Sequence, residues 1–207
     1  MKRIFTFVAL IVLIASFGFA QDAAVQTSAV VTVQAGHNSM TAASVHFKNV
    51  VTITARHKDG TIFAQRIVPN LVTNAGFTAI EKAISDTATQ PAAANYIALA
   101  NDTSNGNVGT VAVTDTALNS SGTGSTEITD HGLARAQGTF TADSPGSKQY
   151  TVSKVFTSTT GTISCNKVGL FNASSGTTMY YEALFTQVTL NGANGDTLTV
   201  TWTSTLS

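Results

Sequence analysis

The sequence VHFKNVVTITARHKDGTIFAQRIV, residues 45–68, decides the fold class. In its first half, Val51, Ile53 and Ala55 alternate with polar residues. An alternation with a period of two is typical of a β-strand that buries one face. An Asp-Gly pair at 59–60 separates this run from a second alternating run, and Asp-Gly between two such runs is a strong β-hairpin signal. We therefore predict two antiparallel strands joined by this turn.

The chain from residue 95 onward continues in the same style. Short runs of strand-forming residues are separated by turns rich in Gly, Ser, Asn and Asp. Regular spacing of this kind is typical of a β-sandwich or a barrel. We predict an all-β protein, a β-sandwich of the jelly-roll or immunoglobulin-like kind. The later strands are expected at 96–100, 109–113, 133–140, 149–157, 161–170, 180–190 and 197–205.

One short helix is expected between the hairpin and the later strands. Residues 75–85 carry Phe77, Ile80 and Ile84 at helical spacing, and Thr73 or Asn74 can cap the first turn. This apolar stripe would lie on a sheet.

The N-terminus has the pattern of a secretory signal peptide. Lys2 and Arg3 precede an apolar run at 4–17, and small residues at Gly18 and Ala20 predict cleavage before Gln21. We expect a signal peptide at 1–20, an N-terminal extension strand and linker at 21–39, and a single sandwich domain at 40–207. The mature chain would be extracellular or on the cell surface, with no membrane segment.

Composition narrows the choice of partners. Charged residues make up 11% of the chain, and 11 basic residues balance 11 acidic ones, so a basic nucleic-acid-binding surface is not expected. Cys165 is the only cysteine, which excludes an intrachain disulfide. Its position in an alternating run predicts a buried, unreactive thiol.

Residues 25–35 form a separate alternating segment directly after the predicted cleavage site. Val25, Ala29, Val31 and Val33 fall on one face, and a turn-like Gly-His-Asn-Ser at 36–39 links the segment to the rest. Such a strand can complete its own sheet, or it can add to a sheet of a neighbouring subunit. The sequence leaves both arrangements open.

Several short blocks resemble a known group of proteins when they are taken together. These blocks are NLVTNAGF (70–77), NYIAL (95–99), GLAR (132–135), VGLFN (168–172) with Gly176, and GDTLTVTW (195–202). Their order resembles the phage tail-fibre-like and virion structural β-domain proteins, which implies a small structural domain over 45–205. The signal peptide departs from that family and points to an exported cellular protein. In architecture the chain is also similar to secreted filament subunits that polymerise by donor-strand exchange.

No enzyme active site and no cofactor are expected. The four histidines lack zinc-ligand spacing, and no Gly-x-Ser-x-Gly motif occurs. Glu182 is the one acidic residue within an apolar strand, and we expect it on the surface face, paired with Lys154 or Lys167. No metal site is predicted, although the oxygen-rich residues 101–105 leave a calcium ion open as an alternative.

Three Asn-x-Ser/Thr sequons lie in expected loops, at Asn101, Asn119 and Asn172. They would accept glycans in an organism that glycosylates asparagine.

These observations favour a structural subunit of an extracellular, pilus-like filament or surface layer. It would form a homopolymer without covalent links, by donating residues 22–36 to the neighbouring subunit. The alternative is a secreted adhesin derived from a tail fibre, a carbohydrate-binding module that recognises glycans or other cells through loops 101–107 and 119–126.

Overall fold

The structure of the 207-residue chain is a computed structural model. It describes residues 31–32, 44–45, 47–85, 88–103, 109–118, 125–142, 144, 148–176 and 178–206. The predicted signal peptide, and Val25, Ala29 and Val33 of the extension, lie outside the described residues.

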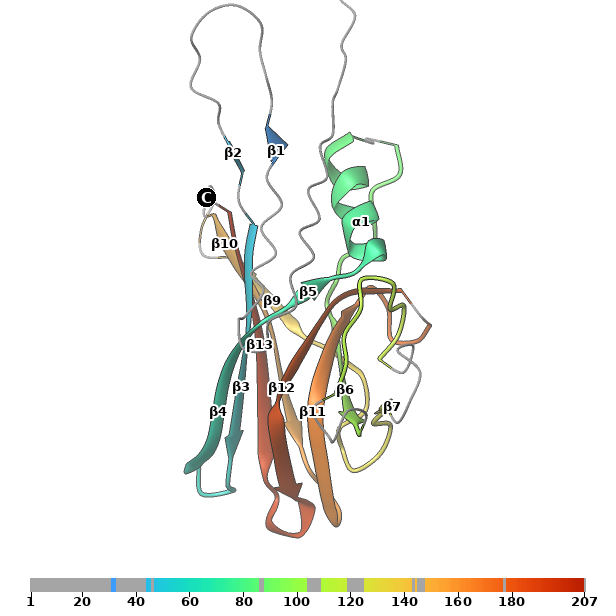
Figure 1. Ribbon diagram of the computed structural model, residues 1–207. Helices are drawn as coiled ribbons and strands as arrows, with labels where there is room; N and C mark the ends of the chain where they lie inside the picture. Colours follow the sequence, from blue (N-terminus) through green and yellow to red (C-terminus); the bar gives the residue numbers. More distant parts are fainter. Residues whose placement is uncertain are drawn as a thin grey trace, which may run out of the picture.

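Two antiparallel sheets pack face to face (Figure 1). The five-stranded sheet has the order β4-β3-β13-β10-β9, and the six-stranded sheet has the order β5-β12-β11-β6-β7, with β8 also paired to β6. The strands of the five-stranded sheet are β3 (Phe47–Arg56), β4 (Ile62–Pro69), β9 (Thr139–Ala142), β10 (Gln149–Thr157) and β13 (Thr197–Leu206). Those of the six-stranded sheet are β5 (Leu71–Val72), β6 (Tyr96–Asp102), β7 (Ser125–Glu127), β8 (Ala136–Gln137), β11 (Thr162–Phe171) and β12 (Met179–Asn191).

Three smaller elements complete the described fold. The helix α1 (Asn74–Ser85) joins β5 to β6, and a 3₁₀ turn, η1 (Gly192–Asn194), joins β12 to β13. A separate two-stranded ribbon pairs β1 (Val31–Thr32) with β2 (Ser44–Val45). The predicted all-β sandwich with one short helix is therefore confirmed.

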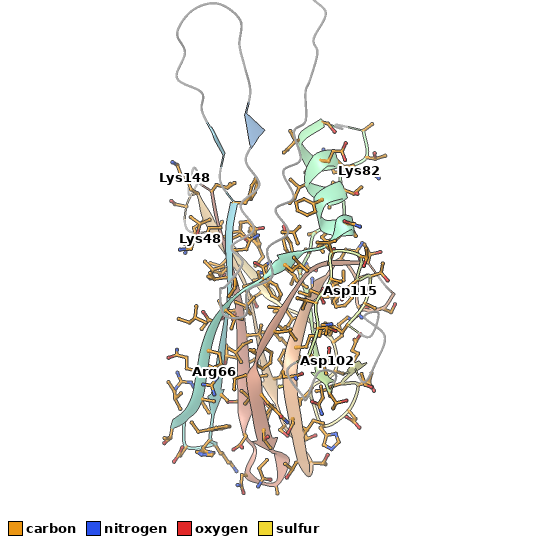
Figure 2. The ribbon with its side chains drawn as sticks, in the orientation of Figure 1. Lys48, Arg66, Lys82, Asp102, Asp115 and Lys148 are labelled. Carbon is orange, nitrogen blue, oxygen red and sulfur yellow. The ribbon has the colours of Figure 1, made fainter. Side chains whose placement is uncertain are left out.

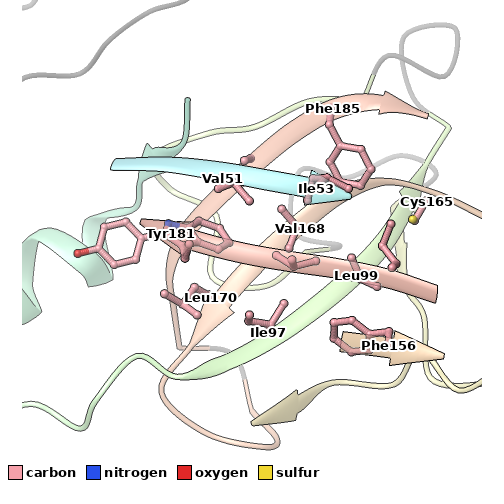
Figure 3. Close-up of a cluster of buried hydrophobic side chains, with 14 of the residues drawn as sticks. Val51, Ile53, Ile97, Leu99, Phe156, Cys165, Val168, Leu170, Tyr181 and Phe185 are labelled. Atoms are coloured by element: carbon pink, nitrogen blue, oxygen red, sulfur yellow. The ribbon is translucent and has the colours of Figure 1, made fainter. Parts of the chain in front are cut away.

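The core lies between the two sheets and is built from the predicted alternation. Val51, Ile53 and Ala55 of β3 are fully buried, and they face apolar residues of β11 and β12 (Figure 3). Trp202 of β13 lies in the same core, with its ring centroid 6.2 Å from that of Tyr181. Cys165 is also buried there, as predicted, and burial raises the pKa of its thiol to about 12, so the thiol is unreactive at neutral pH.

The outer face of the six-stranded sheet carries a second, smaller core. Residues 109–118 fold across this face, and Leu118 packs there against Phe171 and Met179. As a result, β11 is buried on both faces along its second half. A sheet face that the sequence pattern alone would leave to solvent is covered here.

The predicted strand at 109–113 is wrong. The backbone N–H groups of Thr110 and Ala112 donate to carboxylates of Asp102, Asp115 and Glu182 instead of to a neighbouring strand. The segment therefore runs as a loop whose hydrogen bonds are made by side chains.

The predicted helix is present, but of its expected apolar stripe only Ile80 packs against the core. Gly76 and Ala79 are buried, whereas Phe77 is 37% exposed and Ile84 is 74% exposed. A Cβ atom at position 76 would lie 2.2 Å from the backbone oxygen of Tyr180, so the helix approaches β12 through its smallest residue. Thr73 caps the helix by accepting a hydrogen bond from Gly76 N, as predicted.

Arg135 fixes the long connection between β7 and β8. Its guanidinium donates two hydrogen bonds to the carboxylate of Glu127, at 2.9 and 2.6 Å, and lies 3.6 Å above the ring of Phe171. It also donates to the backbone oxygen of Gly176. One buried side chain thus ties three segments of the six-stranded sheet together.

Candidate functional site

Strand β4 is one of the two edges of the five-stranded sheet, and β9 is the other. Within the residues that the structure describes, β4 pairs only with β3. Ala64 and Val68 face the core, while Phe63 and Ile67 point outward, and Ile67 is 69% exposed. Figure 2 shows this edge at the left of the molecule, marked by Arg66. We call the outward face and free backbone of this strand the β4 edge.

Most natural proteins protect such an edge with charged residues, proline or a bulge. Here Pro69 lies at the end of the strand, and Arg66, its one charged residue, lies opposite Ile53 on the core-facing side. The outward face of β4 before Pro69 therefore carries two apolar side chains, Phe63 and Ile67, with the polar Gln65 between them. This arrangement is suited to pairing with a further strand.

A second apolar surface lies between α1 and the end of the sandwich. It is a groove of about 290 Å³, and we call it the helix groove. The exposed ring of Phe140 borders it and lies 5.5 Å from the ring of Tyr150. The lining residues come from α1, the 91–95 segment, β9, β10 and β12: Gly76, Ala79, Ile80, Ala83, Pro91, Ala92, Ala93, Ala94, Asn95, Phe140, Tyr150, Tyr180 and Tyr181.

A buried charged cluster lies under residues 109–118, on the outer face of the six-stranded sheet. Nζ of Lys167 lies 3.3 Å from Oε2 of Glu182, 3.7 Å from Oδ2 of Asp102 and 3.8 Å from Oδ2 of Asp115. None of the four side chains is more than 3% exposed. Figure 2 shows Asp102 and Asp115 on the β6–β7 side of the molecule. We call these four residues the Lys167 cluster.

Backbone hydrogen bonds hold the carboxylates in place. Ala112 N donates to Asp115 Oδ2 and to Glu182 Oε1, and Thr110 N donates to Asp102 Oδ2. The side-chain amide of Asn166 bonds both the N–H and the carbonyl of Asp102, at 2.7 Å each. The cluster is therefore rigid and closed to solvent.

The cluster holds three carboxyl groups and one ammonium group. If all four groups were ionised, the buried site would carry an excess of negative charge. Burial raises the pKa of Glu182 from 4.5 to about 7, although the charge of Lys167 opposes this shift. The nearby carboxylate of Asp115 adds to the rise. Near neutral pH, the carboxyl group of Glu182 therefore lies close to its own pKa, in a site that excludes water.

The expectation for Glu182 was partly wrong. Its partner is Lys167, one of the two predicted lysines, but the pair is fully buried and does not lie on a surface face. Lys154 lies on β10, in the other sheet. Alternation placed Glu182 correctly on the face opposite the core, but it carried no information about the segment that covers this face.

The residues predicted for assembly and glycosylation are placed as follows. Val31 lies in β1 and pairs with Val45 of the same chain. Asn101 was expected in a loop, but it lies within β6, where it pairs with Thr126. Asn172 directly follows β11, and Asn119 lies outside the described residues.

Parts of the two loops expected in an adhesin lie outside the described chain, at 104–108 and 119–124. Asp102, considered for a calcium ion, points its carboxylate at Lys167. In the described portion, no three His, Cys, Asp or Glu side chains gather as a metal-ion site. Among the same residues, no helix has the length and apolar character needed to cross a membrane.

Comparison with known proteins identifies no relative. No protein-family model, no curated protein and no solved structure matches this chain.

Proposed function

We propose that this chain is a structural subunit of an extracellular filament or surface layer. Its subunits would join without covalent links, because residues 22–36 of one subunit add as a strand to the β4 edge of the next. The observation that carries this proposal is the β4 edge itself, whose outer backbone has no strand partner among the described residues and whose Phe63 and Ile67 point outward.

The chemistry of strand addition suits this edge. Main-chain hydrogen bonds supply affinity, and alternating side chains set the register. Arg66 on the inward side disfavours indiscriminate pairing between two copies of β4, because their edges would bring like charges together. A donor with small, uncharged apolar residues, such as Val25, Ala29, Val31 and Val33, avoids this repulsion.

The ribbon β1–β2 supports a strand role for the donor. Val31 and Thr32 pair in antiparallel fashion with Val45 and Ser44 of the same chain. Polymerisation would exchange this short pairing within one chain for a longer pairing between two chains. The exchange favours the polymer because more backbone groups and apolar side chains are paired.

The test is electron microscopy of the secreted protein, with and without residues 22–36. Before microscopy, N-terminal sequencing of the protein from the medium should show that the mature chain begins at Gln21. The full mature chain is expected to form regular, unbranched fibres or sheets, and the deletion should leave uniform single particles. Normal fibres from the deletion variant would exclude donation of this strand. Single particles from the full chain would exclude the filament.

The alternative function is a secreted adhesin derived from a tail fibre, and the helix groove favours it. The ring of Phe140 is 59% exposed and lies beside the half-buried ring of Tyr150, and sugars stack on exposed aromatic faces. A glycan array should then show binding that Phe140→Ala abolishes. An adhesin predicts this result for single particles, whereas the filament proposal requires no glycan.

A further inference from the structure

We propose that the side chains of Lys167 and Asp102 join in an intramolecular amide bond, which covalently links strand β11 to strand β6. Nζ of Lys167 lies 3.7 Å from Oδ2 of Asp102, and neither side chain is exposed. The two residues are on hydrogen-bonded neighbouring strands, where Lys167 lies opposite Ala100. Bond formation therefore has to close the gap between two side chains on adjacent strands.

The surroundings favour condensation. Amide formation from an amine and a carboxyl group releases water, so a site that excludes water favours the product. A Cβ atom at Gly109 would lie 2.5 Å from Leu184 and 3.2 Å from Cβ of Asp102, which shows how closely the loop covers the cluster. The backbone of the covering loop therefore packs directly against the cluster and leaves no room for a side chain at position 109.

The three carboxyl groups are not equivalent. Glu182 and Asp115 share one backbone donor, Ala112 N, and act on each other's charge. Oε2 of Glu182 is buried, accepts no hydrogen bond from the described residues and faces Nζ of Lys167 at 3.3 Å. These features suit Glu182 to carry a proton, with Asp115 as its partner.

Asp102 is suited to be the acceptor. Thr110 N donates to its Oδ2 and can stabilise the negative charge that develops on this oxygen during attack. The bonds from Asn166 hold the backbone of Asp102 in place. The carboxyl carbon is thereby presented to the lysine.

The reaction balances without any other reactant. Lys167 gives a proton to the cluster and becomes a neutral amine, whose nitrogen lone pair attacks Cγ of Asp102. The C–N bond forms, one C–O bond of the carboxyl group breaks, and Glu182 passes protons to the leaving oxygen. The products are one amide and one water molecule, and no oxidation or reduction takes place.

Such a link would stabilise the fold covalently, which a disulfide within the chain cannot do. The chain has one cysteine, which is buried, so no disulfide can join its strands. An amide between β6 and β11 would resist reducing agents and mechanical load. The bond does not depend on how the subunits assemble.

The test is peptide mapping by mass spectrometry of the full chain after denaturation. The tryptic peptide that contains Asp102 should be joined to the peptide that contains Lys167, at their summed mass less one water. Trypsin should no longer cleave after Lys167, because its ammonium group is lost. Separate peptides at full mass from a correctly folded protein would overturn the proposal.

Two conservative variants make the assignment specific. Asp102→Asn should release ammonia instead of water and give the same amide, so its product should have the same mass as the wild-type product. If that variant still loses water, Glu182 or Asp115 is the acceptor, and the assignment to Asp102 is wrong. Glu182→Gln should leave the chain uncondensed.

Glu81→Gln is the matched control for Glu182→Gln, because Glu81 is exposed on α1 and lies outside the cluster. It should condense as the wild type does. Near-UV circular dichroism of each variant confirms folding before its mass is interpreted. Full condensation in Glu182→Gln would overturn the role of Glu182.

Discussion

Nζ of Lys167 lies 3.3 Å from Oε2 of Glu182, and neither side chain is exposed to solvent. The pair joins the central strand β11 to its neighbour β12 within the six-stranded sheet. Buried charges are costly unless they are paired and hydrogen-bonded, so this contact connects the stability of the sheet to the protonation of one carboxyl group.

Stability should fall as the pH rises from mildly acidic to neutral. Burial raises the pKa of Glu182 from 4.5 to about 7, so over this interval the folded chain keeps a proton that the unfolded chain has lost. The unfolding free energy contributed by this group is largest below the lower value and is lost as the pH passes the higher one, a change on the order of 3 kcal/mol at most. Urea unfolding at about pH 5 and about pH 8 measures the change. Glu182→Gln should remove this part of the pH dependence, and an unchanged slope in that variant would contradict the assignment.

Lys167→Met should destabilise the fold strongly. Removing the Lys167 side chain takes away the one cation of the cluster and, with it, the proposed amide link to Asp102; breaking a buried ion pair from one side alone costs about 3–5 kcal/mol. The midpoint of thermal unfolding reports the loss. Lys82→Met, at an exposed position in the last turn of α1, is the matched control and should change stability little. Equal effects of the two substitutions would show that the cluster contributes nothing to stability.

Arg135→Lys should behave as a non-conservative change. Lysine cannot form the two parallel bonds to Glu127, and it loses the stacking of the planar guanidinium over Phe171. We expect a loss of about 2 kcal/mol in unfolding free energy. Arg66→Lys, where the side chain bonds only its neighbour Gln65 among the described residues, provides the comparison. Similar losses at both positions would rule out this explanation.

Gly76→Ala should loosen α1 from the sandwich. The added methyl group would meet the backbone oxygen of Tyr180, which cannot move without disturbing β12. Overpacking of this kind costs about 1–3 kcal/mol, whereas alanine in an unconstrained helix stabilises it. Hydrogen exchange of the α1 amides measures the effect, with Thr78→Ala on the exposed side of the helix as the control. Slower exchange in Gly76→Ala would show that the close approach to Tyr180 does not exclude a side chain at position 76.

Assembly should depend on the charge of the β4 edge. Ile67→Lys places a charge on the edge strand and should prevent fibre formation in electron micrographs, without loss of folding, because Ile67 is exposed. Val155→Lys is the matched control, since Val155 is 55% exposed on the same sheet but lies on β10, between β9 and β13. Fibres from Ile67→Lys, or their loss in Val155→Lys alone, would place the contact elsewhere.

Local pattern was sufficient to predict most strands. Strand β10 matches its predicted bounds of 149–157, and the β3–β4 hairpin forms around the predicted Asp-Gly turn, where Gly60 has φ 88°. These elements depend on alternation and turn chemistry, which are properties of adjacent residues. The helix stripe was predicted wrongly because spacing identifies an apolar face but not the distance to its partner. At Gly76 that distance admits no side chain.

The sequence by itself determined the class of fold, the positions of most strands, the single helix and the burial of Cys165, because each follows from the order of neighbouring residues. Only the tertiary structure decided that Asp102, Asp115, Lys167 and Glu182 meet, and that β4 is an edge. These four residues come from separate segments, which are brought together when β6 and β12 pair on either side of β11 and residues 109–118 fold over them. The alternation of apolar and polar residues indicates which side of a strand a residue faces. The segment that covers this side is decided by contacts between residues far apart in the sequence.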